Sequence, residues 1–300
     1  MRIGIDLGGT KTEIAVLDEG GGERLRRRVA TPQADYDAVI RTMRDLVTGA
    51  ESELGVRATV GVAIPGTISP VTGLVKNANA TRLIGHPLDK DLGAALGRAV
   101  RVANDANCFT LSEATDGAAK GREIVFGIIA GTGVGGGVCI GGRVLTGAHA
   151  IAGEWGHNPL PAPRGDEIAL APTCYCGRTG CIEAWCSGPA LMAQFERRTS
   201  RKLIATEIAA EAANGGEDAM QVFAAYLDRF ARAIAGVVNI LDPDAIVIGG
   251  GLSKIDTLYA ELPARVEHYA FSPQGPSLIV QNHHGDSSGV RGAAWLWPEG

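Results

Sequence analysis

The feature that most constrains the fold is a strand, a glycine turn and a second strand, a pattern that the chain carries twice. Near the N-terminus, the apolar run RIGID at residues 2–6 leads through LGGTK at 7–11 into TEIAVL at 12–17, which has the alternation of a strand. The second copy is VFGIIAGTGVGGGVCIGGRVL at residues 125–145. This repetition predicts two lobes of related architecture.

Glycine is the anomaly of the composition, with 42 of 300 residues, about twice the usual share of ~7%. The glycines gather at the ends of predicted strands, at Gly8–Gly9, Gly131 to Gly137 and Gly249 to Gly251. At these points the backbone must turn tightly or approach a ligand closely, because glycine alone carries no side chain in the way.

The rest of the pattern alternates helices with strands. The clearest helix covers residues 217–241, where apolar residues recur in steps of three and four, and it should stop near Asp242 because Pro243 follows. Helical spacing also covers two shorter stretches, and apolar runs predict three buried strands. The helical stretches are 35–54 and 287–297, and the strands are 59–66, 100–107 and 245–251. Such alternation is typical of the α/β class.

Length and charge limit the function classes. Three hundred residues predict two lobes rather than one core. The net charge of -5 argues against nucleic-acid binding, and the basic run from Arg24 to Arg28 is interpreted as a solvated strand edge or turn. The N-terminus turns polar at Asp6 and no apolar run approaches ~18 residues, so we expect no signal peptide, no membrane span and a cytoplasmic protein.

The glycine turns raise the question of which phosphate-binding chemistry they serve. The chain lacks G-x-x-x-x-G-K-[ST], and GTGVGG at 131–136 leads into another strand, not into the helix that a dinucleotide site requires. A strand–turn–strand grip remains, in which glycine N–H groups and Thr10 face an anion while Asp6 holds Mg²⁺ directly or through water. AGTG offers a second grip with Thr132.

Several motifs, taken in order, resemble one family. IGIDLGGTKTEIAVLD and IIAGTGVGGG are similar to the two phosphate motifs of the superfamily of sugar kinases, heat-shock chaperones and actin, and IVIGGGLS is similar to its adenosine motif. GEWGHNPL with CYCGRTGCIE resembles the ROK family of sugar kinases. NANA, NDANC, VVNILDPDAIVIGGGLS and HGDSSGVRGAAWLWP resemble the bacterial fructokinases and mannokinases of that family in particular. The resemblance covers nearly the whole chain.

The resemblance implies a two-lobed α/β fold of the actin-like ATPase (ribonuclease H-like) type, with the active site in a cleft between the lobes. We expect a small lobe at 1–115, on which a C-terminal helix at 287–300 packs back, and a large lobe at 116–286 that carries a zinc knuckle. The implied reaction transfers a phosphoryl group from ATP, with Mg²⁺, to the 6-hydroxyl of fructose, with mannose as a further acceptor. The alternative is another hexose: glucose, N-acetylglucosamine or N-acetylmannosamine.

The resemblance also assigns roles to residues. Asp105 in NDAN is the expected base that takes the proton of the attacking hydroxyl, whereas its residue type alone fits a helix cap equally well. Lys11 is as consistent with a solvated side chain as with a phosphate contact. The expected sugar contacts are Gly66, Asn79, Asn104, Asp105, Glu154, His157 and Glu183. The expected nucleotide contacts are Asp6, Gly8, Gly9, Thr10, Lys11, Gly131, Thr132, Gly133, Gly250 and Gly251.

Four of the six cysteines lie within thirteen positions, at Cys174, Cys176, Cys181 and Cys186. Cys174 and Cys176 are too close for a relaxed disulfide, C-x-C is not the C-x-x-C redox spacing, and a cytoplasmic chain keeps its thiols reduced. Three thiolates on a glycine-bearing knuckle therefore predict a tetrahedral zinc that needs a fourth ligand. Cys186 is the local candidate, whereas the ROK pattern implies His157, with one ring nitrogen on zinc and the other reaching a sugar hydroxyl.

Two other classes of function fit part of the pattern. ROK proteins include sugar-responsive repressors, which carry a DNA-binding helix-turn-helix segment before the first phosphate motif; that motif starts here at Ile3, so we expect no such segment. A catalytically idle sugar-binding protein would bind sugar without ATP turnover. We therefore expect an enzyme that binds ATP and a sugar and forms a homodimer, as the resemblance implies.

Overall fold

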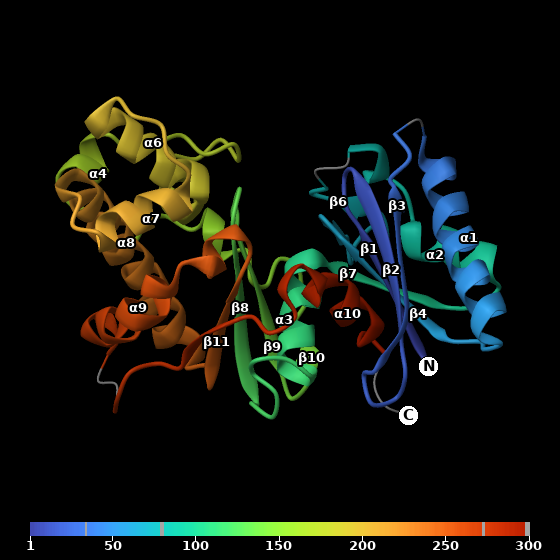
Figure 1. Ribbon diagram of the computed structural model, residues 1–300. Helices are drawn as coiled ribbons and strands as arrows, with labels where there is room; N and C mark the ends of the chain where they lie inside the picture. The colour runs from blue at the N-terminus through green and yellow to red at the C-terminus, as the bar shows by residue number, and fades with distance from the viewer. Residues whose placement is uncertain (34, 79–80, 272–273, 298–300) are drawn as a thin grey trace. The chain divides into compact units, whose positions relative to one another are not determined.

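The computed structural model describes residues 1–33, 35–78, 81–271 and 274–297 (Figure 1). The chain folds into two compact units. Unit 1 comprises residues 1–121, 137–152 and the C-terminal stretch from residue 286, and unit 2 comprises residues 122–136 and 153–285. Among the helices of the described residues, none is both long and apolar enough to cross a membrane.

Two five-stranded sheets share one strand order. The first runs β3-β2-β1-β4-β7 and the second runs β10-β9-β8-β11-β12. In the first sheet β1 pairs antiparallel with β2 and parallel with β4, and in the second β11 pairs parallel with both β8 and β12. The repeated glycine hairpins occupy equivalent places, β1–β2 and β8–β9, so the prediction of two related α/β lobes is confirmed.

The strands keep the predicted positions, with small differences at their ends. The strand predicted at 100–107 ends at Asn104, because a helix begins at Asp105. The strands are β1 (Arg2–Leu7), β2 (Lys11–Leu17), β3 (Glu23–Ala30), β4 (Thr59–Ile64), β5 (Thr67–Ile68), β6 (Val75–Lys76), β7 (Val100–Asn104), β8 (Ile124–Ala130), β9 (Val134–Ile140), β10 (Arg143–Val144), β11 (Ala245–Gly249) and β12 (Ile279–Gln281).

The predicted long helix is confirmed as α8 (Glu217–Leu241), and its C-cap residue Asp242 has a left-handed conformation just before Pro243. The other α-helices of the described residues are α1 (Tyr36–Leu54), α2 (Leu88–Leu96), α3 (Asp105–Thr115), α4 (Asp166–Ala169), α5 (Ile182–Cys186), α6 (Gly188–Thr199), α7 (Ala205–Ala213), α9 (Asp256–Tyr269) and α10 (Ser288–Ala294). Short 3₁₀ turns are η1 (Thr81–Leu83), η2 (Trp155–His157), η3 (Gly251–Lys254) and η4 (Gly285–Ser287).

The two faces of the first sheet have different partners, and this places Asp6. Successive strand residues point to opposite faces, so Ile3 and Ile5 of β1 enter the core that also holds Val39 and Met43 of α1. Gly4 and Asp6 therefore face the other side, where α10 contacts β1, β4 and α3.

Glycines let α10 lie directly on that face. A Cβ atom at Gly4 would lie 1.9 Å from the carbonyl oxygen of Val290, and one at Gly61 would lie 1.9 Å from that of Ala293. On the helix itself, a Cβ at Gly292 would lie 1.6 Å from the carbonyl oxygen of Cys108 in α3. Backbone therefore packs on backbone at all three points, which holds β1, β4, α3 and α10 in one arrangement.

Candidate functional site

Asp6 and Asp105 form the acidic part of the candidate site in unit 1. Asp6 lies near the end of β1, opposite Glu13 of β2 and beside Ala63 of β4. Burial, reinforced by the negative charges of Asp105 and Glu13, raises the pKa of Asp6 to about 7, and Arg28 acts in the opposite direction. A half-buried carboxyl group with acidic neighbours is a natural ligand for a divalent cation, so Asp6 fits the predicted Mg²⁺ role.

Glu13 is a neighbour of Asp6 that the sequence did not single out. It is buried and forms ion pairs with Arg26 and Arg28 of β3, with 2.7 Å between Arg28 Nε and Glu13 Oε2. The basic run was expected at a solvated strand edge. β3 is indeed an edge strand. Arg26 and Arg28 nevertheless pair with the buried carboxylate of Glu13, because Glu13 is the register partner of Arg28.

Asp105 stands at the junction of β7 and α3. The residue that caps α3 is Asn104, whose Oδ1 accepts a hydrogen bond from the backbone N–H of Ala106 at 2.9 Å. Asp105 Oδ1 also accepts from that N–H group, at 2.8 Å. The structure therefore gives the capping position to Asn104, and Asp105 follows it at the helix start, half-buried and close enough to raise the pKa of Asp6.

In the first glycine turn, hydrogen bonds hold the backbone while three residues are exposed to solvent. Gly8 N–H donates to the carbonyl oxygen of Lys11 at 3.0 Å, and the Thr31 hydroxyl donates to the carbonyl of Gly8 at 2.9 Å. Gly9, Thr10 and Lys11 are exposed, and a Cβ at Gly9 would have no neighbour within 4 Å. The turn thus has the fixed backbone and unobstructed face that an anion grip requires.

Two predicted sugar contacts in unit 1 gain no further support from local geometry. A Cβ at Gly66 would lie 2.8 Å from the carbonyl oxygen of Lys76 and 2.9 Å from Ala78, so close packing already accounts for glycine there. Asn79 lies outside the described residues.

In unit 2, the predicted nucleotide segments lie side by side. The turn between β8 and β9 holds Gly131, Thr132 and Gly133, and a Cβ at Gly131 would lie 3.5 Å from the backbone nitrogen of Gly251. Gly250 has φ of 81°, and a Cβ there would meet the carbonyl oxygen of Ala130 at 2.5 Å. Thr132 and Gly251 are exposed, so this pair of turns also leaves backbone accessible.

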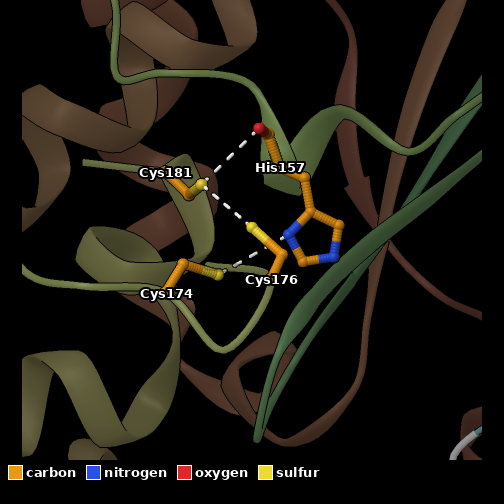
Figure 2. A group of neighbouring side chains, drawn as sticks. All are labelled: His157, Cys174, Cys176 and Cys181. Carbon is orange, nitrogen blue, oxygen red and sulfur yellow. Dashed lines mark hydrogen bonds between the residues drawn. The ribbon is translucent and has the colours of Figure 1, made fainter. Parts of the chain in front are cut away.

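Three cysteines and one histidine of unit 2 converge on one point (Figure 2). The ligand atoms of His157, Cys174, Cys176 and Cys181 all lie within 4.8 Å of one another. His157 Nδ1 is 3.6 Å from Cys174 Sγ, and the sulfur atoms of Cys176 and Cys181 are 3.7 Å apart. Within the described part of the chain, this is the group of metal-ligating side chains that the structure assembles, and Cys186 is not a member.

The local backbone explains why these four side chains meet. Thr173 and Thr179 pair as an isolated β-bridge, and Gly177 turns the loop between them with φ of 86°. A second bridge joins Pro159 to Cys181, which brings the segment after His157 alongside the knuckle.

The donor set fits zinc. Tetrahedral zinc with Zn–S bonds of ~2.3 Å and Zn–N bonds of ~2.0–2.1 Å places its ligand atoms about 3.5–3.8 Å apart, which is the spacing of the two measured pairs. All six cysteines are free thiols in the structure, so no disulfide staple is formed. Burial, followed by the neighbouring thiols Cys176 and Cys174, raises the pKa of Cys181, and a bound cation would favour its thiolate.

The expected sugar-contact acids of unit 2 flank this knuckle. Glu183 lies in the first turn of α5, and its Oε2 accepts from the backbone N–H of Val134 at 2.9 Å. Its Oε1 is 3.8 Å from Cys174 Sγ, so one carboxylate links the second glycine turn to the cysteine group. Glu154 is exposed, and the buried indole of Trp155 donates to the carbonyl of Gly135 at 3.0 Å, which fixes the segment before His157.

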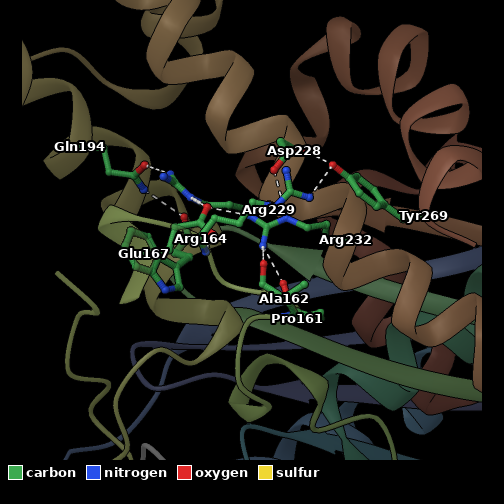
Figure 3. A network of polar contacts seen from close by, with 10 residues as sticks. Pro161, Ala162, Arg164, Glu167, Gln194, Asp228, Arg229, Arg232 and Tyr269 are labelled. Atoms are coloured by element: carbon green, nitrogen blue, oxygen red, sulfur yellow. Dashed lines mark hydrogen bonds and ion pairs between the residues drawn. The ribbon is translucent and has the colours of Figure 1, made fainter. Parts of the chain in front are cut away.

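Cys186 lies beside a separate polar network that joins α4 and α8, away from the other three cysteines of the cluster. Arg229 and Arg232 of α8 donate to Glu167 of α4 (Figure 3), at 2.7 and 2.6 Å. Arg232 also donates to the carbonyl oxygens of Pro161 and Ala162 at 2.6 and 2.8 Å. Cys186 is fully buried beside this network, and burial raises its pKa to about 12. The network ties α4 to α8, which is a structural role.

Comparison with known proteins places this geometry in a family. The sequence model of the ROK family matches residues 2–300. An N-acetyl-D-glucosamine kinase of Yersinia pseudotuberculosis serotype IB (strain PB1/+) is 39% identical over 300 residues, which cover 99% of this chain and 98% of that protein.

Solved structures give the same result for the fold. The ROK hexokinase from Thermus thermophilus is 30% identical with a TM-score of 0.86, over 98% of this chain and 97% of that one. A ROK family glucokinase from Streptomyces griseus, solved in complex with glucose and AMPPNP, is 26% identical with a TM-score of 0.77, over 100% of this chain and 99% of that one.

Proposed function

Because this chain belongs to the ROK family and is a sugar kinase, we propose that it transfers the γ-phosphoryl group of ATP to the 6-hydroxyl of N-acetylglucosamine. The observation that carries this proposal is the 39% identity to an N-acetyl-D-glucosamine kinase along 99% of the chain. The fructokinase-like segments of this chain favoured fructose, with glucose, N-acetylglucosamine or N-acetylmannosamine as the alternative. The relatives support that alternative better than fructose.

Asp105 is the proposed base. As the sugar oxygen forms its bond to the γ-phosphorus, the bond from that phosphorus to ADP breaks and the hydroxyl proton passes to the Asp105 carboxylate. The support is its position at a strand–helix junction with a carboxylate that is half-buried and close enough to Asp6 to raise the pKa of Asp6.

Asp6 and the exposed glycine turns are the proposed nucleotide site. Bound Mg²⁺ supplies neutralisation of the phosphate charge, and Asp6 is the residue that would hold it. The turns at Gly8–Lys11 and Gly131–Gly133 offer backbone N–H groups to the phosphates, and Gly250–Gly251 leaves room for adenosine.

Zinc is the proposed occupant of the cysteine and histidine group. It would be held by His157, Cys174, Cys176 and Cys181, and it supplies a fixed orientation for the His157 ring. Glu154, His157 and Glu183 are the proposed sugar contacts of unit 2, with Asn104 and Gly66 in unit 1. The predicted homodimer and cytoplasmic location stay proposals too, and the mechanism depends on neither.

The proposal is tested by measuring ADP release with N-acetylglucosamine, N-acetylmannosamine, glucose, mannose and fructose as acceptors. We expect the highest kcat/KM with N-acetylglucosamine. Its margin over glucose, mannose and fructose should be at least about tenfold, because a site built for the acetamido group leaves polar groups unpaired with sugars that lack it. A higher kcat/KM with fructose would restore the fructokinase alternative, and absence of turnover with every sugar would reject the kinase.

A further inference from the structure

Tyr175 stands between two of the proposed zinc ligands and was missed in the sequence, because a tyrosine in a cysteine knuckle carries no signal of its own. Its side chain is mostly solvent-exposed, with 78% of the residue accessible. Its hydroxyl oxygen is nevertheless 3.0 Å from Nε2 of His157, and the two rings meet edge to face at 5.2 Å. Although Tyr175 is exposed, its side chain therefore has a specific partner in His157.

The two ring nitrogens of His157 have different partners. Nδ1 lies 3.6 Å from Cys174 Sγ and faces the cysteine group (Figure 2), while Nε2 faces Tyr175. When Nδ1 binds a cation, the ring proton must sit on Nε2, which then donates to the Tyr175 oxygen. Nε2 is also the atom that would donate to a sugar hydroxyl in the proposed function.

The Tyr175 hydroxyl occupies the position that a sugar hydroxyl would take beside His157. Its oxygen lies at hydrogen-bond distance from Nε2, so it can accept the N–H group that the proposed function assigns to the sugar. Because Tyr175 is exposed, its hydroxyl and a sugar hydroxyl both have access to this nitrogen.

We propose that the Tyr175 hydroxyl competes with a sugar hydroxyl for Nε2 of His157, so that Tyr175 is a positioning residue that weakens sugar binding. This inference rests on the proposed sugar site. It follows from the geometry because one N–H group cannot make two well-directed hydrogen bonds at full strength. Removing the hydroxyl while keeping the ring frees Nε2 without disturbing the edge-to-face contact.

The test is isothermal titration calorimetry of Tyr175→Phe with N-acetylglucosamine, without ATP. We expect the Kd to fall about 2- to 10-fold, the worth of one net hydrogen bond. In turnover assays the sugar KM should fall by the same factor with kcat unchanged, and bound zinc should stay at the wild-type level. The matched control is Tyr36→Phe, which removes a hydroxyl that donates to Asp91 at 2.8 Å in unit 1 and should leave the Kd unchanged.

The outcomes separate this inference from the proposed function. If Tyr175→Phe binds the sugar equally well or more weakly while wild-type protein binds and phosphorylates it, the competition is refuted and the kinase proposal stands. If the wild type prefers another hexose, the competition stands if Tyr175→Phe binds that hexose more tightly than the wild type does, and it is refuted if it does not. If the wild type binds no hexose, both fail.

Discussion

The two units hold their proposed functional groups by different means. In unit 1, Asp6 and Asp105 are positioned by backbone packing, since Gly4, Gly61 and Gly292 let α10 lie directly on the sheet and on α3. In unit 2, His157 and Glu183 are positioned by side chains, through the cysteine group and the hydrogen bond from Val134. The first arrangement should be sensitive to added volume, and the second to the loss of a single ligand.

The comparison also suggests a division of labour. Unit 1 carries the proposed base and magnesium ligand, whereas unit 2 carries the proposed zinc group and the acids around it. Substitutions of the acidic residues in unit 1 should therefore act on kcat, and those around the knuckle should act on sugar affinity. Two predictions test this division, a third tests the packing of α10, and a fourth tests the polar network of α8, from the largest expected effect to the smallest.

Asp105→Asn should lower kcat about 10²- to 10⁴-fold, because the amide cannot accept the proton of the attacking hydroxyl. Turnover is measured as ADP release at saturating sugar and ATP. Asp45→Asn on the exposed face of α1 is the matched control and should keep wild-type kcat. Near-normal turnover by Asp105→Asn would remove this residue from the chemistry.

Cys176→Ser should abolish zinc binding and raise the sugar KM at least about tenfold, because His157 and the knuckle lose their common anchor. The measurements are metal content by mass spectrometry and initial rates. Cys186→Ser is the control, since that thiol lies outside the group, and it should keep about one zinc per chain. Zinc that survives in Cys176→Ser and disappears in Cys186→Ser would reverse the ligand assignment.

Gly61→Ala should destabilise the protein by about 1–3 kcal/mol or more, because the new methyl group would overlap the Ala293 carbonyl and displace α10. Gly49→Ala is the contrasting variant. It lies inside α1 and its Cβ would meet only the end of Arg27 at 3.4 Å, so it should be neutral or stabilising. Chemical denaturation measures both, and equal stability of the two variants would contradict the packing account.

The smallest effect concerns Glu167, in a network apart from the proposed chemistry. Burial acts to raise the pKa of Glu167, but hydrogen bonds from Arg232 and Arg229 outweigh it and lower the pKa below its usual value. The stabilisation is therefore present at neutral pH and is lost as pH falls through the lowered pKa. Glu167→Gln should unfold about 1–3 °C earlier at pH 7. The gap should narrow as pH falls below 4.5, the usual glutamate value, and close once pH is below the lowered pKa. A gap that is constant with pH would exclude the ion pairs as its source.

Local patterns predicted much of the fold. Glycine turns after apolar runs located β1–β2 and β8–β9, and regular spacing located α8 with its end at Asp242. Contacts between distant segments could not be predicted this way. The pairing of Glu13 with Arg28 depends on strand register, and the seating of α10 on Gly61 depends on tertiary packing.

The residues of the candidate site were also predictable only where local sequence carried the signal. Cysteine spacing alone predicted a zinc knuckle but left the fourth ligand open, and His157 came from family resemblance. The structure brings His157 to the cysteines through the bridge between Pro159 and Cys181, a contact that spacing does not encode. Tyr175 was missed because its relevance lies in the direction of one hydroxyl group toward His157.

The most direct test of the division of labour is calorimetric binding of N-acetylglucosamine to Asp105→Asn and to Cys176→Ser, side by side with wild type. Because the substituted amide would keep a hydrogen-bonding side chain at this position, we expect Asp105→Asn to bind the sugar within about threefold of the wild-type Kd. We expect Cys176→Ser to bind at least about tenfold more weakly. Loss of binding in Asp105→Asn with wild-type affinity in Cys176→Ser would contradict the account.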